Sequence, residues 1–268
     1  MNRSTFVATA ALTALAPALA LTGPTATAAP SAGDAPAAAP YAVSAKINRA
    51  EVVAGEDTVR ITGRVRPAAA GKPVVLQQRA EGSKRWKKSG TAKVKATGRF
   101  VLKDDPSSPG VRFYRVLKPA GNGLAAGRSR ELKLSVWAWG RLAYRPAGAN
   151  AGIVRNTTTH FGTEAFRSSL VTETAGTPGF VEYTLGRKCR TLRATYALTD
   201  DSATGATGAV TVTVDGTAKA THALSTGVIA EDRTVDITGA FRLRFDAVAS
   251  AAPAGSAAIG TPEVLCLD

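Results

Sequence analysis

Short apolar alternations, each ended by Gly, Pro, Asn or Asp, recur along almost the whole chain and limit what it can fold into. In "TVRITGRV" the apolar residues Val59 and Ile61 alternate with polar ones, and "GAVTVTVDG" repeats the pattern with Val210, Val212 and Val214. A period of two places alternate side chains on opposite faces of a strand. Helical periodicity is nearly absent after the N-terminal segment. These runs, with turn residues between them, predict an all-β chain built of sandwiches.

The first residues predict export. Arg3 precedes an apolar stretch at residues 6–21, and a small-x-small cleavage site follows at residues 26–28. This is the pattern of a secretory signal peptide over residues 1–28. A transmembrane anchor is the alternative, but Pro17 interrupts the run and no basic stop-transfer segment follows. We therefore expect no membrane span and a secreted, extracellular protein that could associate with the cell wall.

Charge divides the rest of the chain. An Ala/Pro-rich linker at residues 29–40 is too poor in bulky side chains to join a core. Residues 41–137 then hold 21 Lys and Arg against 7 Asp and Glu, whereas residues 138–268 hold 12 of each kind. Such a break predicts two units with different surfaces. Trp137 and Trp139 lie at the break, where we expect them to pack one unit on the next rather than stack on sugar rings.

The basic excess is densest in one short stretch of the first unit. It is a candidate patch for an anionic polymer, made of Lys84, Arg85, Trp86, Lys87 and Lys88. A phosphate-rich wall polymer, an acidic polysaccharide or nucleic acid would each be attracted by charge. Export argues against nucleic acid as a normal partner. The alternative interpretation is a solvated face without a ligand.

The first unit also resembles a known module. The stretches "AGKPVVLQQRAEGSKRWKKSGTAKVKATGRFVLK" and "GVRFYRVL" are similar to the immunoglobulin-like (Ig-like) modules of exported actinobacterial proteins. The resemblance covers about Val43–Val136 and implies an Ig-like β-sandwich, but it says nearly nothing about a ligand.

Two cysteines, Cys189 and Cys266, are present. An even pair in an exported chain predicts a disulfide. In a jelly-roll sandwich the last strand commonly returns beside an early one, which would bring these two residues face to face. Two cysteines are too few for a zinc site, and we predict no metal centre.

The second unit resembles the novel putative carbohydrate-binding module (NPCBM) family, a galactose-binding-like jelly roll. A strand ending in Leu-Gly, an acidic pair after a strand, a Val-x-Val-x-Val strand closed by Asp-Gly, and a later Val-Asp-x-Thr-Gly block carry the resemblance over about Trp139–Leu267. The matching positions are Tyr183, Leu185, Gly186, Cys189, Tyr196, Asp200, Asp201, Gly208, Val210, Val212, Val214, Asp215, Gly216, Val235, Gly239, Leu243 and Phe245. The resemblance implies a second β-sandwich that binds glycan.

The candidate ligand-binding residues of the second unit are Asp200 and Asp201, in the acidic pair, and His222 in the run that follows. A calcium ion at the acidic pair is a weaker alternative, because the loop lacks the alternating Asp and Asn ligands of a dedicated site. The chain also departs from the family. An Asp/His-Ala-Asp-Trp stretch is missing before the last strand, and no Trp follows Trp139. Tyr196 alternates with apolar residues and is expected in the core.

Catalysis is not predicted. Adjacent carboxylates such as Asp200 and Asp201 point in opposite directions at a strand end and cannot face each other across a cleft. His160 and His222 lack a recognisable partner motif for nucleophilic catalysis and are expected in loops or on the surface. We therefore expect a protein that is not an enzyme and needs no cofactor.

Two functions remain. The first is glycan binding at a cell surface or in the environment, with the basic Ig-like unit as a spacer that attracts anionic wall polymer. The second is a structural or protein-interaction role at the cell surface, with a degenerate sugar site.

Overall fold

The computed structural model describes residues 38–268, and these residues form β-structure almost throughout. The prediction of an all-β sandwich fold is confirmed. The predicted signal peptide, and the predicted linker up to residue 37, lie outside the described residues.

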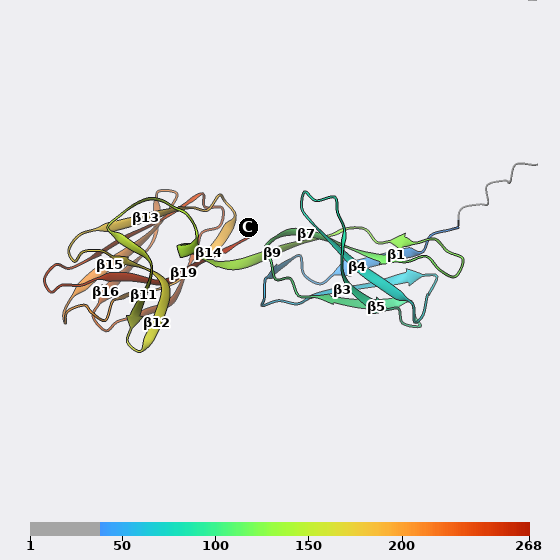
Figure 1. Cartoon of the computed structure of the whole chain (residues 1–268), viewed down its shortest axis with the longest axis horizontal. Coiled ribbons are helices and arrows are strands. Elements are labelled where there is room, and N and C mark those ends of the chain that lie inside the picture. The colour runs from blue at the N-terminus through green and yellow to red at the C-terminus, as the bar shows by residue number, and fades with distance from the viewer. Residues whose placement is uncertain (1–37) are drawn as a thin grey trace, which may run out of the picture. The chain divides into compact units, whose positions relative to one another are not determined.

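The first group of strands forms two facing sheets (Figure 1). One sheet has the order β1-β3-β6, and in the other β9, β7, β4 and β5 lie side by side, with β2 parallel to β9 and β8 paired to β7. The strands are β1 (Ala42–Ile47), β2 (Glu51–Val53), β3 (Val59–Arg66), β4 (Pro73–Ala80), β5 (Lys87–Lys93), β6 (Arg99–Asp104), β7 (Gly110–Lys118), β8 (Gly127–Arg128) and β9 (Leu132–Arg141).

Alternation explains the core between these two sheets. In β3 the side chains of Val59, Ile61 and Val65 are buried, while Arg60 and Arg64 are exposed. The inward faces of both sheets contribute to one hydrophobic cluster, in which the largest fully buried side chains include Phe100, Tyr114 and Leu134. Burial of each such side chain stabilises the folded state by roughly 1.5–3 kcal/mol.

The second group of strands follows a short 3-10 helix, η1 (Leu142–Tyr144). One sheet has the order β10-β13-β18-β15-β16, and β11, β12, β19, β14 and β17 pair in the facing layer. The strands are β10 (Ala147–Ala151), β11 (Ile153–Phe161), β12 (Glu164–Thr172), β13 (Gly179–Thr184), β14 (Cys189–Leu198), β15 (Thr207–Val214), β16 (Thr217–Ser225), β17 (Ala230–Asp236), β18 (Arg242–Ala249) and β19 (Ala257–Cys266).

The core of this second group is a separate hydrophobic cluster. Val210, Val212 and Val214 point inward from β15, and Tyr196 lies fully buried on β14 as the sequence predicts. Asp215 and Gly216 form a hairpin turn, because Val214 pairs with Thr217 and both turn residues have positive φ, 47° and 82°.

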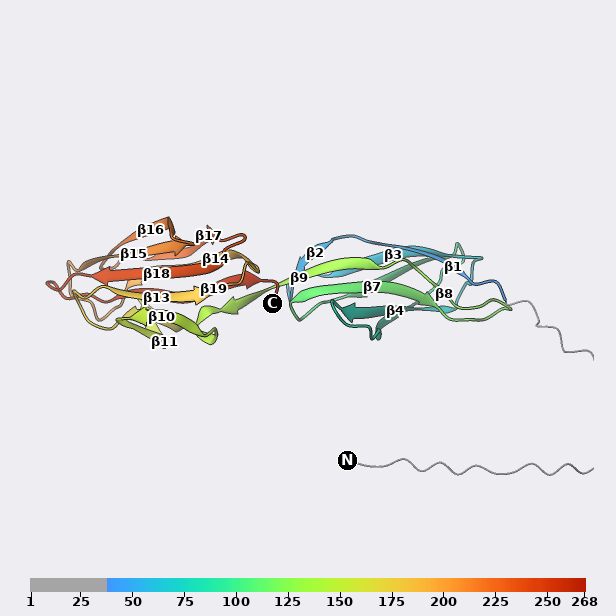
Figure 2. The same cartoon turned by 90° about the horizontal axis from the view of Figure 1, so that it is seen from above.

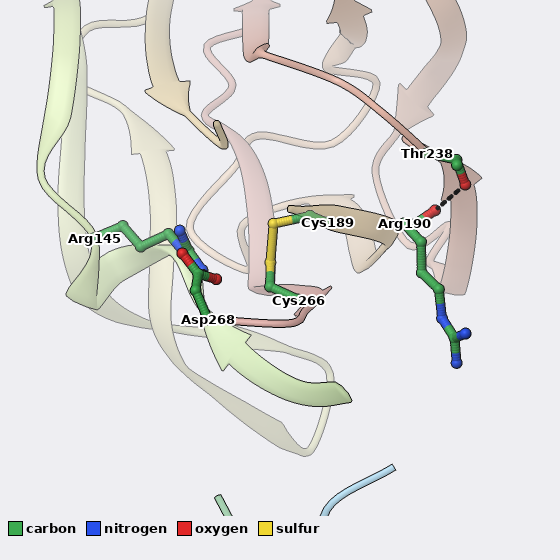
Figure 3. Close-up of a disulfide and its surroundings, with 6 residues drawn as sticks. All are labelled: Arg145, Cys189, Arg190, Thr238, Cys266 and Asp268. Carbon is green, nitrogen blue, oxygen red and sulfur yellow. Dashed lines mark hydrogen bonds and ion pairs between the residues drawn. A yellow bond between two sulfur atoms is a disulfide. The ribbon is translucent and has the colours of Figure 1, made fainter. Parts of the chain in front are cut away.

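The predicted disulfide is confirmed. Cys189 pairs with Cys266 in the register of β14 and β19, and their sulfur atoms are bonded (Figure 3). Both cysteines are buried. Near this bond Arg145 forms an ion pair with Asp268, at 2.9 Å, so the C-terminal residue is also held in place.

Strand β9 belongs to the pairing pattern of both groups. Its residues up to Val136 pair with β7, and Ala138 to Arg141 pair with β19. The charge break at residues 137 and 138 therefore falls inside one strand. Trp137 and Trp139 are each covered by an arginine of the second group: Arg190 lies 4.4 Å from one ring centroid and Arg193 lies 4.0 Å from the other.

Candidate functional site

The acidic pair lies in the loop after β14. Asp200 and Asp201 are both exposed, and Oδ1 of Asp200 accepts a hydrogen bond of 2.9 Å from the backbone N–H of Gly162. Gly162 has a φ of 61° in the turn between β11 and β12. Asp200 therefore connects this turn to the end of β14, and this structural contact occupies one of its two carboxylate oxygens.

A depression of about 280 Å³ lies beside Asp200. Its other walls include Phe161, Val228 and Ile229, and the last two side chains are exposed apolar groups. Asp201 does not line it. The depression offers one carboxylate and the hydroxyl groups of Thr199 and Thr226, which already bond to Ser202 and Ala203, so it has few free hydrogen-bonding groups for a polar ligand.

His222 lies apart from the acidic pair and is not the loop or surface residue that the sequence suggested. It is half-buried on β16, and its ring stacks on Tyr196 with centroids 4.0 Å apart. Burial, with Arg233 nearby, lowers the pKa of His222. Its ring packs against the core, so it does not join Asp200 and Asp201 in one site. His160, also placed in a loop or on the surface from the sequence, is an exposed residue of strand β11.

The basic stretch lies in the loop between β4 and β5 and at the start of β5. Lys84, Arg85, Lys87 and Lys88 are exposed, whereas Trp86 is half-buried. The Trp86 ring contacts two arginines that the sequence did not single out, with Arg115 Cζ at 4.0 Å and Arg79 Cζ at 5.2 Å from its centroid. The tryptophan therefore anchors this loop, and the lysines around it present the positive charge.

A different group of side chains gathers on the outer face of the five-stranded sheet, where β18 lies between β13 and β15 (Figure 2). The strand register places Phe180, Asp246 and Thr211 in one row across these three strands, and Glu182 beside Arg244 in the next row. All of these except Glu182 line a depression of about 220 Å³, to which Pro178 and Val248 add apolar surface. We call this group, with Phe180, Arg244, Asp246 and Thr211 at its centre, the Phe180 face.

Arg244 organises the Phe180 face. Its Nε donates to both oxygens of Asp246 at 2.9 Å, and its Nη1 donates to Glu182 at 3.2 Å. Its guanidinium also lies over the ring of Phe180, with Cζ 3.9 Å from the centroid. Asp246 first, and then Glu182, raise the pKa of Arg244. These contacts fix the donors and acceptors in place before any ligand arrives.

Sequence reasoning missed this face although part of its signal is visible. In "RLRFDA" the polar residues Arg242, Arg244 and Asp246 alternate with buried Leu243 and Phe245. The alternation gives the outward direction of these side chains. Their neighbours Phe180 and Glu182 come from a strand about 60 residues earlier, and only the sheet register brings them together.

The described residues offer one group of side chains with the geometry of a metal site. Within residues 38–268, three metal-ligand side chains converge only at Cys189, Cys266 and Asp268, and both sulfur atoms there belong to the disulfide. Asp200 and Asp201 do not take part in such a group. In the same part of the chain, none of the helical structure is long and apolar enough to cross a membrane.

No protein-family model matches the chain, and no curated protein matches it. The resemblances to NPCBM and to Ig-like modules are therefore not confirmed by a family match.

Among solved structures, the chain is similar to the secreted serine protease VesC from Vibrio cholerae, with a TM-score of 0.30 and 13% identity over 83% of the chain. The chain spans 50% of the length of that protease. It is also similar to the CBM36-1 domain of a multidomain xylanase from the hindgut metagenome of Trinervitermes trinervoides, with a TM-score of 0.29 and 11% identity, over 48% of the chain and 95% of that domain.

The first of these similarities corrects the prediction that the chain is not an enzyme. That prediction depended on the lack of a catalytic motif in the sequence. Catalytic groups are recognised by their geometry in the fold and can come from distant parts of a chain, so a missing motif does not decide the matter. With a protease among the similar structures, the prediction is withdrawn. A TM-score of 0.30 carries no argument for protease activity.

Proposed function

We propose that the protein binds glycan through the Phe180 face. The observation that supports this most is the row of Phe180, Asp246 and Thr211, with Arg244 held over the ring by Asp246 and Glu182. A sugar ring has apolar C–H surface and an edge of hydroxyl groups. The face offers apolar surface at Phe180 and Val248 beside fixed donors and acceptors, which is the combination that a small-ligand site needs.

The size and openness of the face fit part of a chain rather than an enclosed small molecule. A depression of about 220 Å³ on an open sheet can take about one sugar unit, with the neighbouring units continuing along the sheet. Thr213, which is paired with Arg244, extends the polar surface in that direction. We therefore propose a neutral glycan polymer of a cell surface or of the environment as the ligand.

The wider organisation is proposed on the same basis. The two hydrophobic cores support an Ig-like module at residues 41–137 and an NPCBM-like jelly roll at residues 138–268. The exposed charges of Lys84, Arg85, Lys87 and Lys88 support attraction of the first module to anionic wall polymer. The disulfide is compatible with a secreted protein, since such bonds persist mainly in oxidising compartments.

One observation favours the second function, a structural or protein-interaction role. The guanidinium of Arg244 covers one side of the Phe180 ring, and no Trp follows Trp139 in the sequence. A sugar ring could then stack only on the remaining apolar surface. A protein partner at the cell surface would use the same face without needing an open aromatic ring.

A glycan array with the mature chain separates these two functions. Retention on one class of neutral glycan, lost in Phe180→Ala and kept in Phe161→Ala at the Asp200 depression, is the expected result. Retention on no glycan at all, together with capture of a protein from the cell surface that Phe180→Ala abolishes, would replace glycan binding by the protein-interaction role. Circular dichroism of each variant checks that the fold is intact.

A further inference from the structure

We propose that the outer face of the sheet β1-β3-β6 binds an acidic polysaccharide. This site lies over the first hydrophobic core, is positively charged and takes an anionic ligand, so it is distinct from the Phe180 face. It rests on the proposed function in one respect only, the attraction of the first module to anionic polymer. A groove of about 640 Å³ crosses the three strands. We call this surface the cationic sheet face.

Positive charge on the cationic sheet face has no compensation. The outward positions of β1, β3 and β6 carry exposed cations and no exposed acid, and these cations are Lys46, Arg60, Arg64, Arg66, Arg99 and Lys103. Within residues 38–268, none of them forms an ion pair. The one acid of these strands, Asp104, accepts hydrogen bonds from Ser89 and Tyr114 instead.

The register brings like charges directly opposite each other. Arg64 pairs with Arg99, and Arg60 pairs with Lys103, on the neighbouring strands β3 and β6. Directly opposed like charges destabilise a sheet, so the arrangement works against folding. An anion held between the two members of a pair would remove this repulsion. Departures from local stability rules of this kind are expected at functional sites.

The groove also indicates what kind of anion fits. Ser44 and Thr62 add hydroxyl groups, and Val101 is an exposed apolar side chain at its edge. Ala45, Gly63 and Phe100 form one row across the three strands. The side chains of Ala45 and Phe100 are buried on the other side of the sheet, so this row presents mainly backbone to the groove.

Guanidinium groups bind carboxylates through paired hydrogen bonds, while hydroxyl and methyl groups suit the edges and C–H surface of sugar rings. A polymer of carboxylate-bearing sugars supplies both kinds of contact. Polyphosphate would supply only the charge.

The test measures binding of the mature chain to polygalacturonate by titration calorimetry at low and moderate salt. The variant Arg64→Gln with Arg99→Gln is expected to bind about tenfold more weakly. A matched variant, Arg130→Gln with Lys133→Gln, removes the same charge from exposed positions at the start of β9, on the other sheet, and is expected to change the affinity less than about twofold.

Two controls keep the proposal falsifiable. The variant Arg60→Gln with Lys103→Gln repeats the test at the second opposed pair, and all variants are expected to melt no lower than the parent, because each loses a repulsion or an unpaired charge. Equal weakening by the Arg130/Lys133 variant and the two sheet variants would show attraction by net charge only and overturn the site. Equally tight binding of inorganic polyphosphate would overturn the sugar ligand. Neutral-glycan retention through Phe180 is measured separately, so its failure is distinct from both outcomes.

Discussion

Removal of the disulfide should weaken the second core by a predictable amount. Cys189 and Cys266 are 77 residues apart in the sequence. A loop of that length loses enough freedom in the unfolded chain to stabilise the fold by about 4 kcal/mol in the chain-entropy model. The variant Cys189→Ala with Cys266→Ala should lose about this much, and the vacated volume of two buried sulfur atoms adds a smaller loss. For a domain with a typical stability of about 5–15 kcal/mol, that is a large fraction.

Urea unfolding combined with hydrogen exchange measures both the size and the place of this effect. Protection should fall in β14, β19 and their neighbours, and stay close to the parent value in β1, β3 and β6, whose core is a separate cluster. The parent protein under reducing conditions is the matched control and should behave like the variant. A loss below about 1 kcal/mol, or an equal loss of protection in both cores, would refute the reasoning.

Three further changes test single contacts. Gly127→Ala should cost about 3 kcal/mol of unfolding free energy by urea titration, because a Cβ there would lie 1.9 Å from the carbonyl oxygen of Tyr41, while Gly121→Ala, which faces open space, should cost little; equal effects would contradict this. The pKa of His222 is lowered from 6.5 in the folded state, so as the pH falls the unfolded chain binds a proton at this histidine before the folded chain does. The free energy of unfolding should therefore fall as the pH drops through and below 6.5, until the folded histidine is also protonated. His222→Gln should flatten this part of a stability–pH curve, and an unchanged curve would reject the role of His222. Arg64→Gln with Arg99→Gln should raise the unfolding free energy by roughly 0.2–1 kcal/mol, and a lower value than the parent would show that the opposed pair is not repulsive.

Alternation alone predicted most strands of the fold. The run "AVSAKI" corresponds to β1 (Ala42–Ile47), and the valines of β15 are buried as expected. Strands with few apolar residues were missed. β10 (Ala147–Ala151) contains only small or polar residues, and β11 (Ile153–Phe161) is rich in Thr and has register shifts against β12. Such strands form because their neighbours offer hydrogen-bonding partners, which the local sequence does not reveal.

Two other strands differ from their predicted places. The run "TAKVKA" predicts a strand at residues 91–96, but β5 spans Lys87–Lys93 and begins in the basic stretch, with a register shift against β4. The run "GVIA" is mostly a turn before β17 (Ala230–Asp236). In both cases the pairing strand, rather than local hydrophobicity, sets where the strand begins.

The candidate sites also differ in how much of them the sequence reveals. The acidic pair and the basic stretch are continuous in sequence, so inspection finds them. The Phe180 face and the cationic sheet face are assembled from three strands each, and their membership depends on register. Outward positions can be read from alternation, but the identity of the neighbouring strand cannot, because it is set by the packing of the whole sandwich.

The central claim is that glycan binds at the Phe180 face rather than at the acidic pair. The direct measurement is a titration of the best-retained neutral glycan into the parent chain and two matched variants, Asp246→Asn and Asp200→Asn. Each variant replaces one carboxylate of the second group of strands by an amide. We predict that Asp246→Asn weakens binding about tenfold or more, because it removes an acceptor and releases Arg244. Asp200→Asn should leave the affinity unchanged. Loss of binding in Asp200→Asn with full binding in Asp246→Asn would contradict the account.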